Sequence, residues 1–289
     1  MSIEVRNLTH TYSRGSAFEA TALDDVSLTI RDGEFLAIVG HTGSGKSTLV
    51  QHLNGLLKPT AGQVLVDGQD INADGADKKR LRQRVGLVFQ YPEYQLFEET
   101  VAKDVAFGPK NQGLSAGEID QRVRKAIAAV QLDYDEVAAR SPFDLSGGQM
   151  RRVAIAGVIA MEPEVLVLDE PAAGLDPKGR ESILEMLETY HREHGKTVVM
   201  VSHSMDDVAR LAERVAVMSN ARLIACDTPR QIFSDARMME SIGLGIPEAA
   251  KLRDLLRAGG FDLAPDLYTE NELADAICAL WQSRKEAGV

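Results

Sequence analysis

Short apolar runs separated by turn-forming residues predict β-strands along most of the chain. The runs that read as strands are Ile3–Val5, Val26–Ile30, Phe35–Val39, Val64–Val66, Val85–Phe89, Val165–Leu168 and Thr197–Val201. Val165–Leu168 is apolar at every position without alternation, which is typical of a strand covered on both faces. A later pair of runs, Val215–Met218 and Leu223–Ala225, predicts a hairpin.

Apolar positions at helical spacing lie between these strands and predict helices. The first helix follows Phe35–Val39 and carries Leu49, Val50, Leu53, Leu56 and Leu57. The next begins at Ser115 with a Ser-x-x-Glu capping box, runs to Leu132, and repeats Ile119, Val123, Ile127 and Val130 along one face. Further helices are expected over Met150–Met161, after Asp176-Pro177 and after Thr228-Pro229, and Asp77–Arg84 is interpreted as a solvated helical face. Strands interleaved with helices predict an α/β fold.

The composition changes near residue 235, where Gly243, Gly245 and Pro247 interrupt the pattern. Two helices follow, one over Ala250–Leu256 and one beginning at Thr269. The apolar face of the second is formed by Leu273, Ile277, Leu280 and Trp281. This predicts a main domain over residues 1–235 and a small helical domain over 236–289, whose role is packing or dimerisation.

The length, net charge and cysteine content of the chain limit the classes of function that it can have. The chain has 289 residues, a net charge of −11 and a pI near 5.1, so a large basic surface for DNA or RNA is not expected. Cys226 and Cys278 lack the spacing of a metal site and are expected to be reduced thiols. Because the longest apolar stretch, Val153–Met161, is too short to cross a bilayer, a membrane role would require a partner.

The most informative stretch is Gly40–Thr48, GHTGSGKST, which lies between a predicted strand and a predicted helix. Glycines there allow backbone dihedrals that are closed to other residues, so amide N–H groups can converge on an anion at the helix N-terminus. Lys46 can then reach the β- and γ-phosphates, and the Ser47 hydroxyl can ligand Mg²⁺. The flanking strand and helix disfavour a chance glycine-rich turn.

Polar side chains follow three of the apolar strands, at Gln90, at Asp169 with Glu170, and at His203. The carboxyl ends of strands in an open α/β sheet are where ligands bind, so these side chains could face one ligand. Asp169 suits the outer shell of Mg²⁺ and Glu170 suits the polarisation of an attacking water. Taken singly, Gln90 could equally be a buried amide and His203 a structural histidine.

Two further features have both a functional and an ordinary interpretation. Ser146, Gly147, Gly148 and Gln149 open the predicted helix over Met150–Met161 and form either a second phosphate-binding tip or a plain N-capped helix. Tyr12 lies in a polar stretch, where its ring either stacks on an adenine or packs against the protein.

Together, GHTGSGKST, Gln90, LSGGQ, VLVLDEP, the loop ending at Asp176 and His203 resemble the ATPase subunit of ATP-binding-cassette (ABC) transporters over about residues 1–235. The resemblance implies a P-loop NTPase fold with a RecA-like core, an N-terminal antiparallel β subdomain and a helical signature subdomain. Tyr91–Pro109 and the loop Ala172–Asp176 look like the ATPases of energy-coupling-factor importers, which serve vitamins and transition-metal ions.

The family also implies ATP and Mg²⁺ as cofactors and a role for each matching residue. Tyr12 would stack on adenine, Glu170 would be the general base, and His203 would contact the γ-phosphate. Mg²⁺ would be held by Ser47 and Gln90 directly and by Asp169 through water. The phosphate-binding residues would be Gly40, His41, Thr42, Gly43, Ser44, Gly45, Lys46, Ser47 and Thr48, completed from a facing subunit by Ser146, Gly147, Gly148 and Gln149. Asp176 would also be among the nucleotide-binding residues.

The partners implied are a second ABC ATPase, identical or homologous, a transmembrane coupling protein that docks near Glu93–Phe97, and indirectly a substrate-binding membrane subunit. The expected location is the cytoplasmic face of a prokaryotic cell membrane, as a peripheral protein. The alternative is a soluble ABC ATPase that acts on nucleic acid or ribosomes, but the chain has no long coiled coil, tandem cassette or basic surface of the kind such proteins carry.

Overall fold

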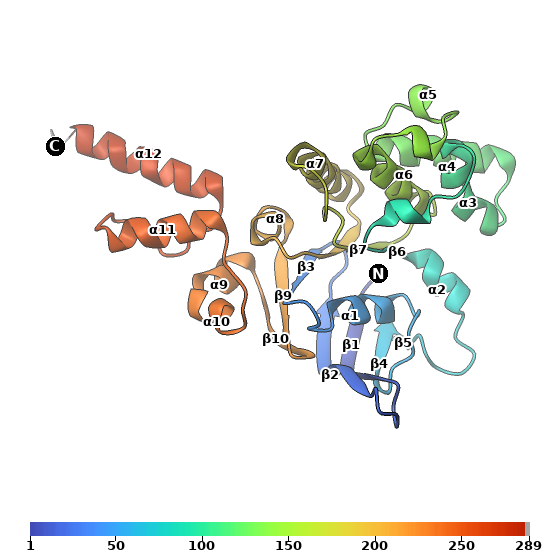
Figure 1. Ribbon diagram of the computed structural model, residues 1–289, viewed down its shortest axis with the longest axis horizontal. Coiled ribbons are helices and arrows are strands. Elements are labelled where there is room, and N and C mark those ends of the chain that lie inside the picture. Colours follow the sequence, from blue (N-terminus) through green and yellow to red (C-terminus); the bar gives the residue numbers. More distant parts are fainter. Residues whose placement is uncertain (287–289) are drawn as a thin grey trace.

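The structure is a computed structural model that describes residues 1–286, in which helices cover two β-sheets (Figure 1). One sheet is antiparallel with the strand order β2-β1-β4-β5, and the other has the order β10-β9-β3-β8-β7-β6. The strands are β1 (Ile3–Tyr12), β2 (Ala20–Ile30), β3 (Phe35–Val39), β4 (Ala61–Val66), β5 (Gln69–Asp70), β6 (Val85–Val88), β7 (Val165–Asp169), β8 (Thr197–Val201), β9 (Arg214–Ser219) and β10 (Arg222–Asp227).

The α-helices are α1 (Lys46–Leu53), α2 (Lys78–Arg84), α3 (Val101–Asn111), α4 (Ala116–Ala129), α5 (Tyr134–Val137), α6 (Gly147–Ile159), α7 (Pro177–His194), α8 (Met205–Leu211), α9 (Pro229–Ser234), α10 (Ala236–Ser241), α11 (Glu248–Ala258) and α12 (Glu270–Glu286). Helices α1, α2, α7 and α8 alternate with the strands, whereas α3–α6 and α9–α12 form two consecutive runs. Two short 3-10 helices, η1 (Pro92–Gln95) and η2 (Pro142–Asp144), precede α3 and α6.

The centre of the larger sheet is parallel, because β3 pairs with β8, β8 with β7 and β7 with β6 in that sense. Every residue of these four strands is buried, which explains why their sequences are apolar without alternation. Parallel strands run in one direction, so their carboxyl ends meet along one edge of the sheet. The residues after Val39, Val88 and Val201, together with Asp169, therefore lie along that edge.

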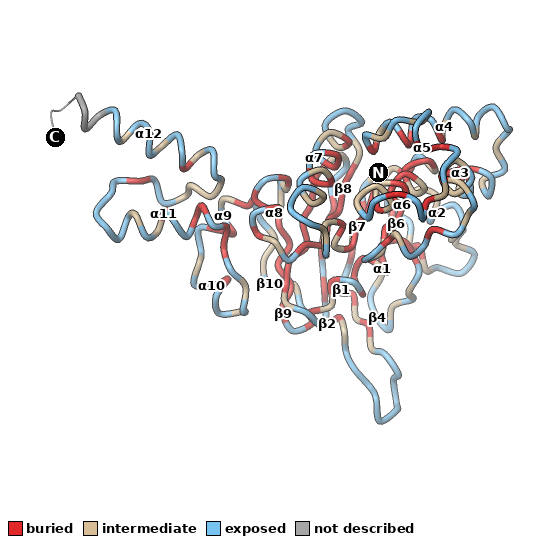
Figure 2. The backbone as a smooth tube through the Cα atoms, turned by 45° about the horizontal axis from the view of Figure 1, so that its top comes forward, coloured by how far each residue is buried: buried red, intermediate tan, exposed pale blue. Residues whose placement is uncertain are grey.

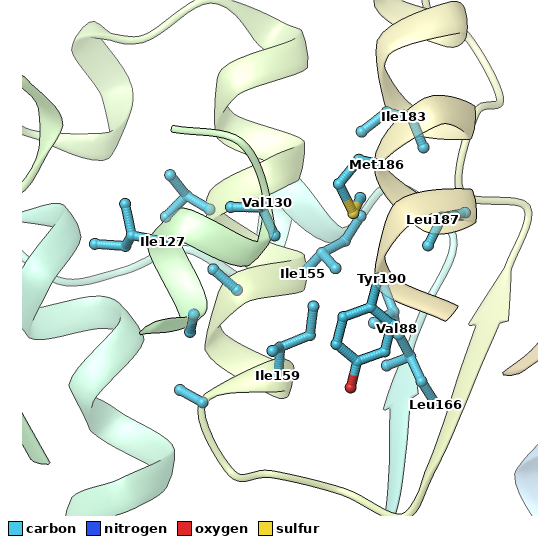
Figure 3. Close-up of a cluster of buried hydrophobic side chains, with 14 of the residues drawn as sticks. Val88, Ile127, Val130, Ile155, Ile159, Leu166, Ile183, Met186, Leu187 and Tyr190 are labelled. Atoms are coloured by element: carbon cyan, nitrogen blue, oxygen red, sulfur yellow. The ribbon is translucent and has the colours of Figure 1, made fainter. Parts of the chain in front are cut away.

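Two hydrophobic cores fix this edge in place. Between the sheets, Leu49 and Leu53 of α1 pack with side chains of both sheets. On the other face, α6 and α7 pack against the sheet, as Figure 3 shows for Ile155, Met186 and Leu166. The same cluster continues into α3 and α4, so the helical subdomain shares one core with the strands that carry the site.

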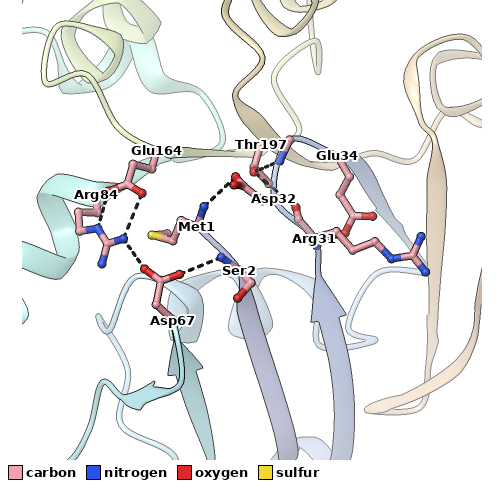
Figure 4. A network of polar contacts seen from close by, with 10 residues as sticks. Met1, Ser2, Arg31, Asp32, Glu34, Asp67, Arg84, Glu164 and Thr197 are labelled. Atoms are coloured by element: carbon pink, nitrogen blue, oxygen red, sulfur yellow. Dashed lines mark hydrogen bonds and ion pairs between the residues drawn. The ribbon is translucent and has the colours of Figure 1, made fainter.

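At the opposite edge of the sheet, polar contacts tie the two sheets together (Figure 4). Arg84, just before β6, pairs with Glu164, just before β7, at 2.5 Å and with Asp67 at 2.6 Å. The amide of Gly33, before β3, donates to the Thr197 hydroxyl at 2.8 Å. Gly33, Arg84 and Glu164 precede their strands and Thr197 begins β8, so this network lies at the amino ends of the parallel strands, away from the edge that bears the site residues.

The C-terminal helices pack on the β9 side of the sheet. Ile232, Phe233, Met239, Ile246 and Ala250 from α9 to α11 pack with residues of β3, α8 and β9. Beyond them, α12 meets α11 through a small cluster containing Ala249 and Leu273, and both helices are exposed along much of their length (Figure 2). The predicted apolar face of the last helix is therefore only partly covered, since Ile277 is 38% and Trp281 69% exposed.

The predicted α/β architecture is confirmed, although several elements begin or end at other residues than predicted, among them α1 and β1. Helix α1 ends at Leu53 and not near Leu57, because the chain turns at Gly55 with a φ of 69°, leaving Leu56 42% exposed. Strand β1 extends through the polar stretch to Tyr12, which pairs with Ala20 of β2. Helices α3, α5, α8 and α10 were not predicted. The division at residue 235 stays a prediction.

Candidate nucleotide-binding and hydrolysis site

The glycine-rich loop links β3 to α1, and at Gly40 and Gly45 its backbone has no room for a side chain. A Cβ atom at Gly45, whose φ is 101°, would lie 2.2 Å from the Ala22 carbonyl oxygen. A Cβ atom at Gly40 would lie 2.3 Å from the Met218 carbonyl oxygen. No side chain caps the N-terminus of α1, so its amide N–H groups and partial positive charge are left for another acceptor.

The Lys46 ammonium lies inside this loop. Its Nζ donates to the carbonyl oxygens of Gly40 at 2.8 Å and His41 at 3.0 Å, and the residue is 5% exposed. Burial lowers the pKa of Lys46, against the opposing attraction of Glu170 and Asp169. An ammonium held near two carboxylates in this way can exchange carbonyl oxygens for phosphate oxygens.

Three strand-end side chains meet at Glu170, directly after β7. Gln90 Nε2 donates to Glu170 Oε2 at 3.0 Å, and His203 Nε2 lies 2.6 Å from Glu170 Oε1. Glu170 has a φ of 53°, an uncommon left-handed conformation for a residue with a side chain. Such conformations cluster at functional sites, and here the carboxylate is oriented from two sides.

The neighbouring carboxyl group, Asp169, is 7% exposed. Burial raises its pKa, while a hydrogen bond with Ser47 and the charges of Lys46 and His203 act in the opposite direction. A buried carboxylate of this kind favours a bound cation, and the hydroxyl, amide and carboxylate oxygens of Ser47, Gln90 and Asp169 are hard ligands of the type that Mg²⁺ prefers. These residues therefore fit Mg²⁺.

Within the described part of the chain, no three histidine, cysteine or acidic side chains are grouped to hold a metal on their own. At phosphates, Mg²⁺ is usually bound by one or two protein oxygens together with phosphate oxygens and water.

Tyr12 lies at the end of β1, beside the start of α1. Its hydroxyl is 3.2 Å from Thr48 Oγ1, and the residue is 40% exposed. Its ring packs edge-on against His10 at 4.5 Å, and His10 packs against buried His52 at 4.7 Å. Burial lowers the pKa of His52. Sequence analysis did not identify this stack, because its members come from two separate elements.

The predicted second phosphate-binding tip opens α6. Ser146 is the N-cap residue: its hydroxyl accepts from the Gln149 amide at 3.3 Å, and Gln149 Oε1 accepts from the Ser146 amide at 3.1 Å. A Cβ atom at Gly147 would meet nothing within 4 Å, and one at Gly148 only Gly179 at 3.9 Å. Among residues 1–286, no hydrogen bond or ion pair links this tip to Gly40–Thr48.

Asp176 caps α7, accepting a hydrogen bond from the Gly179 amide at 2.6 Å, as the cap signal predicts. Two arginines near this loop were missed in the sequence analysis. Arg180 of α7 bonds to Asp207 and Ser204, next to His203. Arg151 of α6 is almost fully buried, and the only signal for it in the sequence was a charged position inside an apolar helix.

Comparison with known proteins identifies the family to which the chain is related. A family model described as "ABC transporter" matches residues 23–173. The energy-coupling factor transporter ATP-binding protein EcfA2 of Symbiobacterium thermophilum is 55% identical over 287 residues, covering 99% of each chain. EcfA2 of Clostridium tetani is 51% identical over 284 residues, covering 98% of this chain and 99% of that protein.

Two solved structures are similar in fold. The structure of cbiO1 from Clostridium perfringens, part of the ABC transporter complex cbiONQ, gives a TM-score of 0.75 at 36% identity and covers 88% of this chain and 98% of its own. A dimeric ATP-binding cassette, MJ0796 bound to ADP and Pi, gives 0.69 at 32% identity and covers 78% and 98%. The chain thus belongs to the ABC transporter family, among its energy-coupling factor ATP-binding proteins.

Proposed function

We propose that this chain binds and hydrolyses ATP as a subunit of an energy-coupling factor importer, powering uptake of a vitamin or transition-metal ion through membrane partners. The main support for this proposal is that Lys46, Glu170 and His203 lie together at one edge of the parallel sheet. The relatives named as energy-coupling factor ATP-binding proteins, which match nearly the whole chain, support the same conclusion.

In this proposal the glycine-rich loop Gly40–Thr48 holds the phosphates through its amides, and Lys46 pairs with the β- and γ-phosphate oxygens. Glu170 accepts a proton from the attacking water. Gln90 and His203 already contact the Glu170 carboxylate, so they can hold it in the direction of that water.

The remaining groups bind and orient. Ser47 and Gln90 would hold Mg²⁺ directly and Asp169 through water, and the ion when bound would neutralise charge on the β- and γ-phosphates. Tyr12 offers a partly exposed ring beside the start of α1 for adenine to stack on.

We further propose that the tip Ser146–Gln149 completes the site of a second ATPase. Glycine inside a helix costs up to about 1 kcal/mol relative to alanine, and nothing in this chain requires glycine at 147 or 148. The space above both Cα atoms is open, which suits a close approach by a phosphate from outside the chain. The dimeric form of the similar cassette MJ0796 is consistent with this role.

A groove beside Glu93–Phe97 is our proposed dock for a transmembrane coupling protein. The cavity has a volume of about 580 Å³, and Phe97 and Phe107 line it while remaining 59% and 45% exposed. Gly157, inside α6, also lines it, and a Cβ atom there would meet nothing within 4 Å. A bare backbone on the wall of an apolar groove suits the close approach of a partner's apolar helix.

No helix in the described residues is long and apolar enough to span a bilayer. From the energy-coupling factor relatives and the proposed dock, we propose a peripheral position on the cytoplasmic face of a prokaryotic membrane. The helical domain 236–289, with α12 only partly covered, is proposed as a dimerisation surface between ATPases.

The test is phosphate release by the chain purified together with its membrane partners. The expected result is turnover that is lost in K46A and reduced in G157L, in which a bulky side chain fills the groove. Turnover that persists in K46A at the wild-type rate would contradict the proposed site. Salt-dependent binding of DNA or RNA by the purified chain would favour the soluble alternative.

A further inference from the structure

One buried guanidinium joins three segments of the site that are far apart in the sequence. Arg151 lies one turn into α6, just after the tip Ser146–Gln149, and is 1% exposed. Its two partners are η1, through Glu93, and the loop that follows Glu170, through the carbonyl groups of Pro171 and Ala173.

The contacts use three nitrogens of the arginine. Nη2 and Nε donate to Glu93 Oε1 at 2.6 Å and Oε2 at 3.0 Å, a bidentate pair. Nη1 donates to the carbonyl oxygen of Ala173 at 2.6 Å and that of Pro171 at 3.1 Å. The planar fork of arginine can make both sets of bonds at once, whereas a lysine ammonium is a single point charge.

The charges at this junction are matched. A buried cation is tolerated only when it is paired and hydrogen-bonded, and Glu93 provides the pairing charge. Burial raises the pKa of Glu93, but the hydrogen bonds from Arg151, a backbone hydrogen bond and the charge of Arg151 together lower it below its ordinary value. The Tyr91 ring adds a cation–π contact, with its centroid 5.8 Å from the guanidinium carbon.

The residues that Arg151 contacts lie next to two proposed functional segments, the dock on one side and Glu170 on the other. Glu93 belongs to the segment Glu93–Phe97 that we propose as the dock, and it follows Gln90 closely. Pro171 directly follows Glu170, and Ala173 lies in the loop that ends at Asp176. A movement of η1 would therefore reach the backbone next to the catalytic carboxylate through one side chain, along contiguous contacts.

We propose that Arg151 is a positioning residue that holds the loop 171–175, and with it Glu170, in the arrangement for hydrolysis, and that its pair with Glu93 transmits docking of the membrane partner to that loop. This inference rests on the function proposed above. Arg151 contacts neither nucleotide nor water in it, and acts only through the loop.

The first test is R151K in the complex with its membrane partners. Lysine keeps the charge but cannot span Glu93 and both carbonyl groups, so kcat per nucleotide-competent site should fall about tenfold to hundredfold. The Kd for ATP and the KM should stay within about twofold of wild type, because the glycine-rich loop is untouched. A purely structural role would lower the number of competent sites and leave kcat per site unchanged, and that outcome would overturn the proposal.

A double-mutant cycle with E93Q provides a second, independent readout, and E93Q alone breaks the charge pair if R151K folds poorly. E93Q keeps an acceptor of similar size but removes the charge. The loss in kcat for E93Q/R151K should be close to that for R151K alone, because the two residues act through one junction. Losses that multiply would show that the residues act independently and would contradict the proposal.

R124Q is the matched control. Arg124 also pairs with a carboxylate on a helix, Asp120, but both partners are exposed and lie away from the site. Its kcat should equal that of wild type. If wild type itself releases no phosphate in the complex, the proposed function fails; if wild type turns over and R151K matches it per site, only the inference about Arg151 fails.

Discussion

Two helices of this protein begin with glycines, and their starts differ in what the chain itself provides. At α1, no side chain caps the helix, and Gly40 and Gly45 cannot be replaced without a clash with backbone carbonyl groups. At α6, Ser146 and Gln149 cap each other, while Gly147 and Gly148 face open space.

Under the proposed function, the difference separates a phosphate site that one chain completes by itself from one that depends on a second subunit. The first amides of α1 have no side-chain cap, so a phosphate can bind there without displacing one, and only the Lys46 ammonium must exchange its carbonyl acceptors. At the tip of α6 the hydroxyl and one amide already bond to each other, so a ligand must compete with the cap. A conditional tip of this kind suits a site that forms only when two subunits close.

The largest expected effect tests the chemistry on the α1 side. E170Q removes the proposed base and keeps the size of the side chain, so kcat should fall about 10²–10⁴-fold. The Kd for ATP, measured by equilibrium binding, should not change. Near-normal turnover in E170Q would exclude Glu170 as the base.

The next effect concerns affinity. K46A removes the ammonium that lies in the loop, and ATP should bind about 100-fold more weakly, a loss of about 2.7 kcal/mol. Isothermal titration with ATP and Mg²⁺ measures this. Unchanged affinity would show that Lys46 does not contact the phosphates.

A matched pair of alanine substitutions compares the two helix starts directly. G45A should lower the free energy of unfolding by about 3 kcal/mol, because its Cβ meets the Ala22 carbonyl and its φ is left-handed. G148A should leave stability unchanged or raise it by about 0.5 kcal/mol, yet slow turnover in the complex about tenfold. Denaturant titration and phosphate release together measure both. An equal loss of stability in G45A and G148A would show that the two helix starts do not differ in their need for glycine.

The smallest expected effect is on stability alone. Because burial raises the pKa of Asp169, its protonated form is favoured in the fold, and stability decreases as the pH rises from about 3.8 through the raised native pKa. D169N removes the charge, so without nucleotide it should melt about 2–4 °C above wild type at pH 7, and the gain should vanish near pH 3. A lower melting temperature at pH 7 would contradict this burial effect.

The sequence predicted those parts of the site whose signals are local. The glycine-rich loop and the residues at strand ends could be placed because a turn, a helix start and a strand end each have a short pattern. Arg151 could not be placed, because its partner Glu93 is 58 positions away and pairing across that distance leaves no periodic trace. The His10–His52 stack was missed for the same reason.

The central claim is that Ser146 of one subunit completes the phosphate site built on Lys46 of another. The most direct measurement is the distance from Ser146 Oγ to the nearest γ-phosphate oxygen in a structure of the ATP-bound E170Q complex. The expected distance is about 3 Å, a hydrogen bond. A fully occupied ATP site with Ser146 more than about 8 Å from every γ-phosphate, well outside hydrogen-bond range, would contradict the claim.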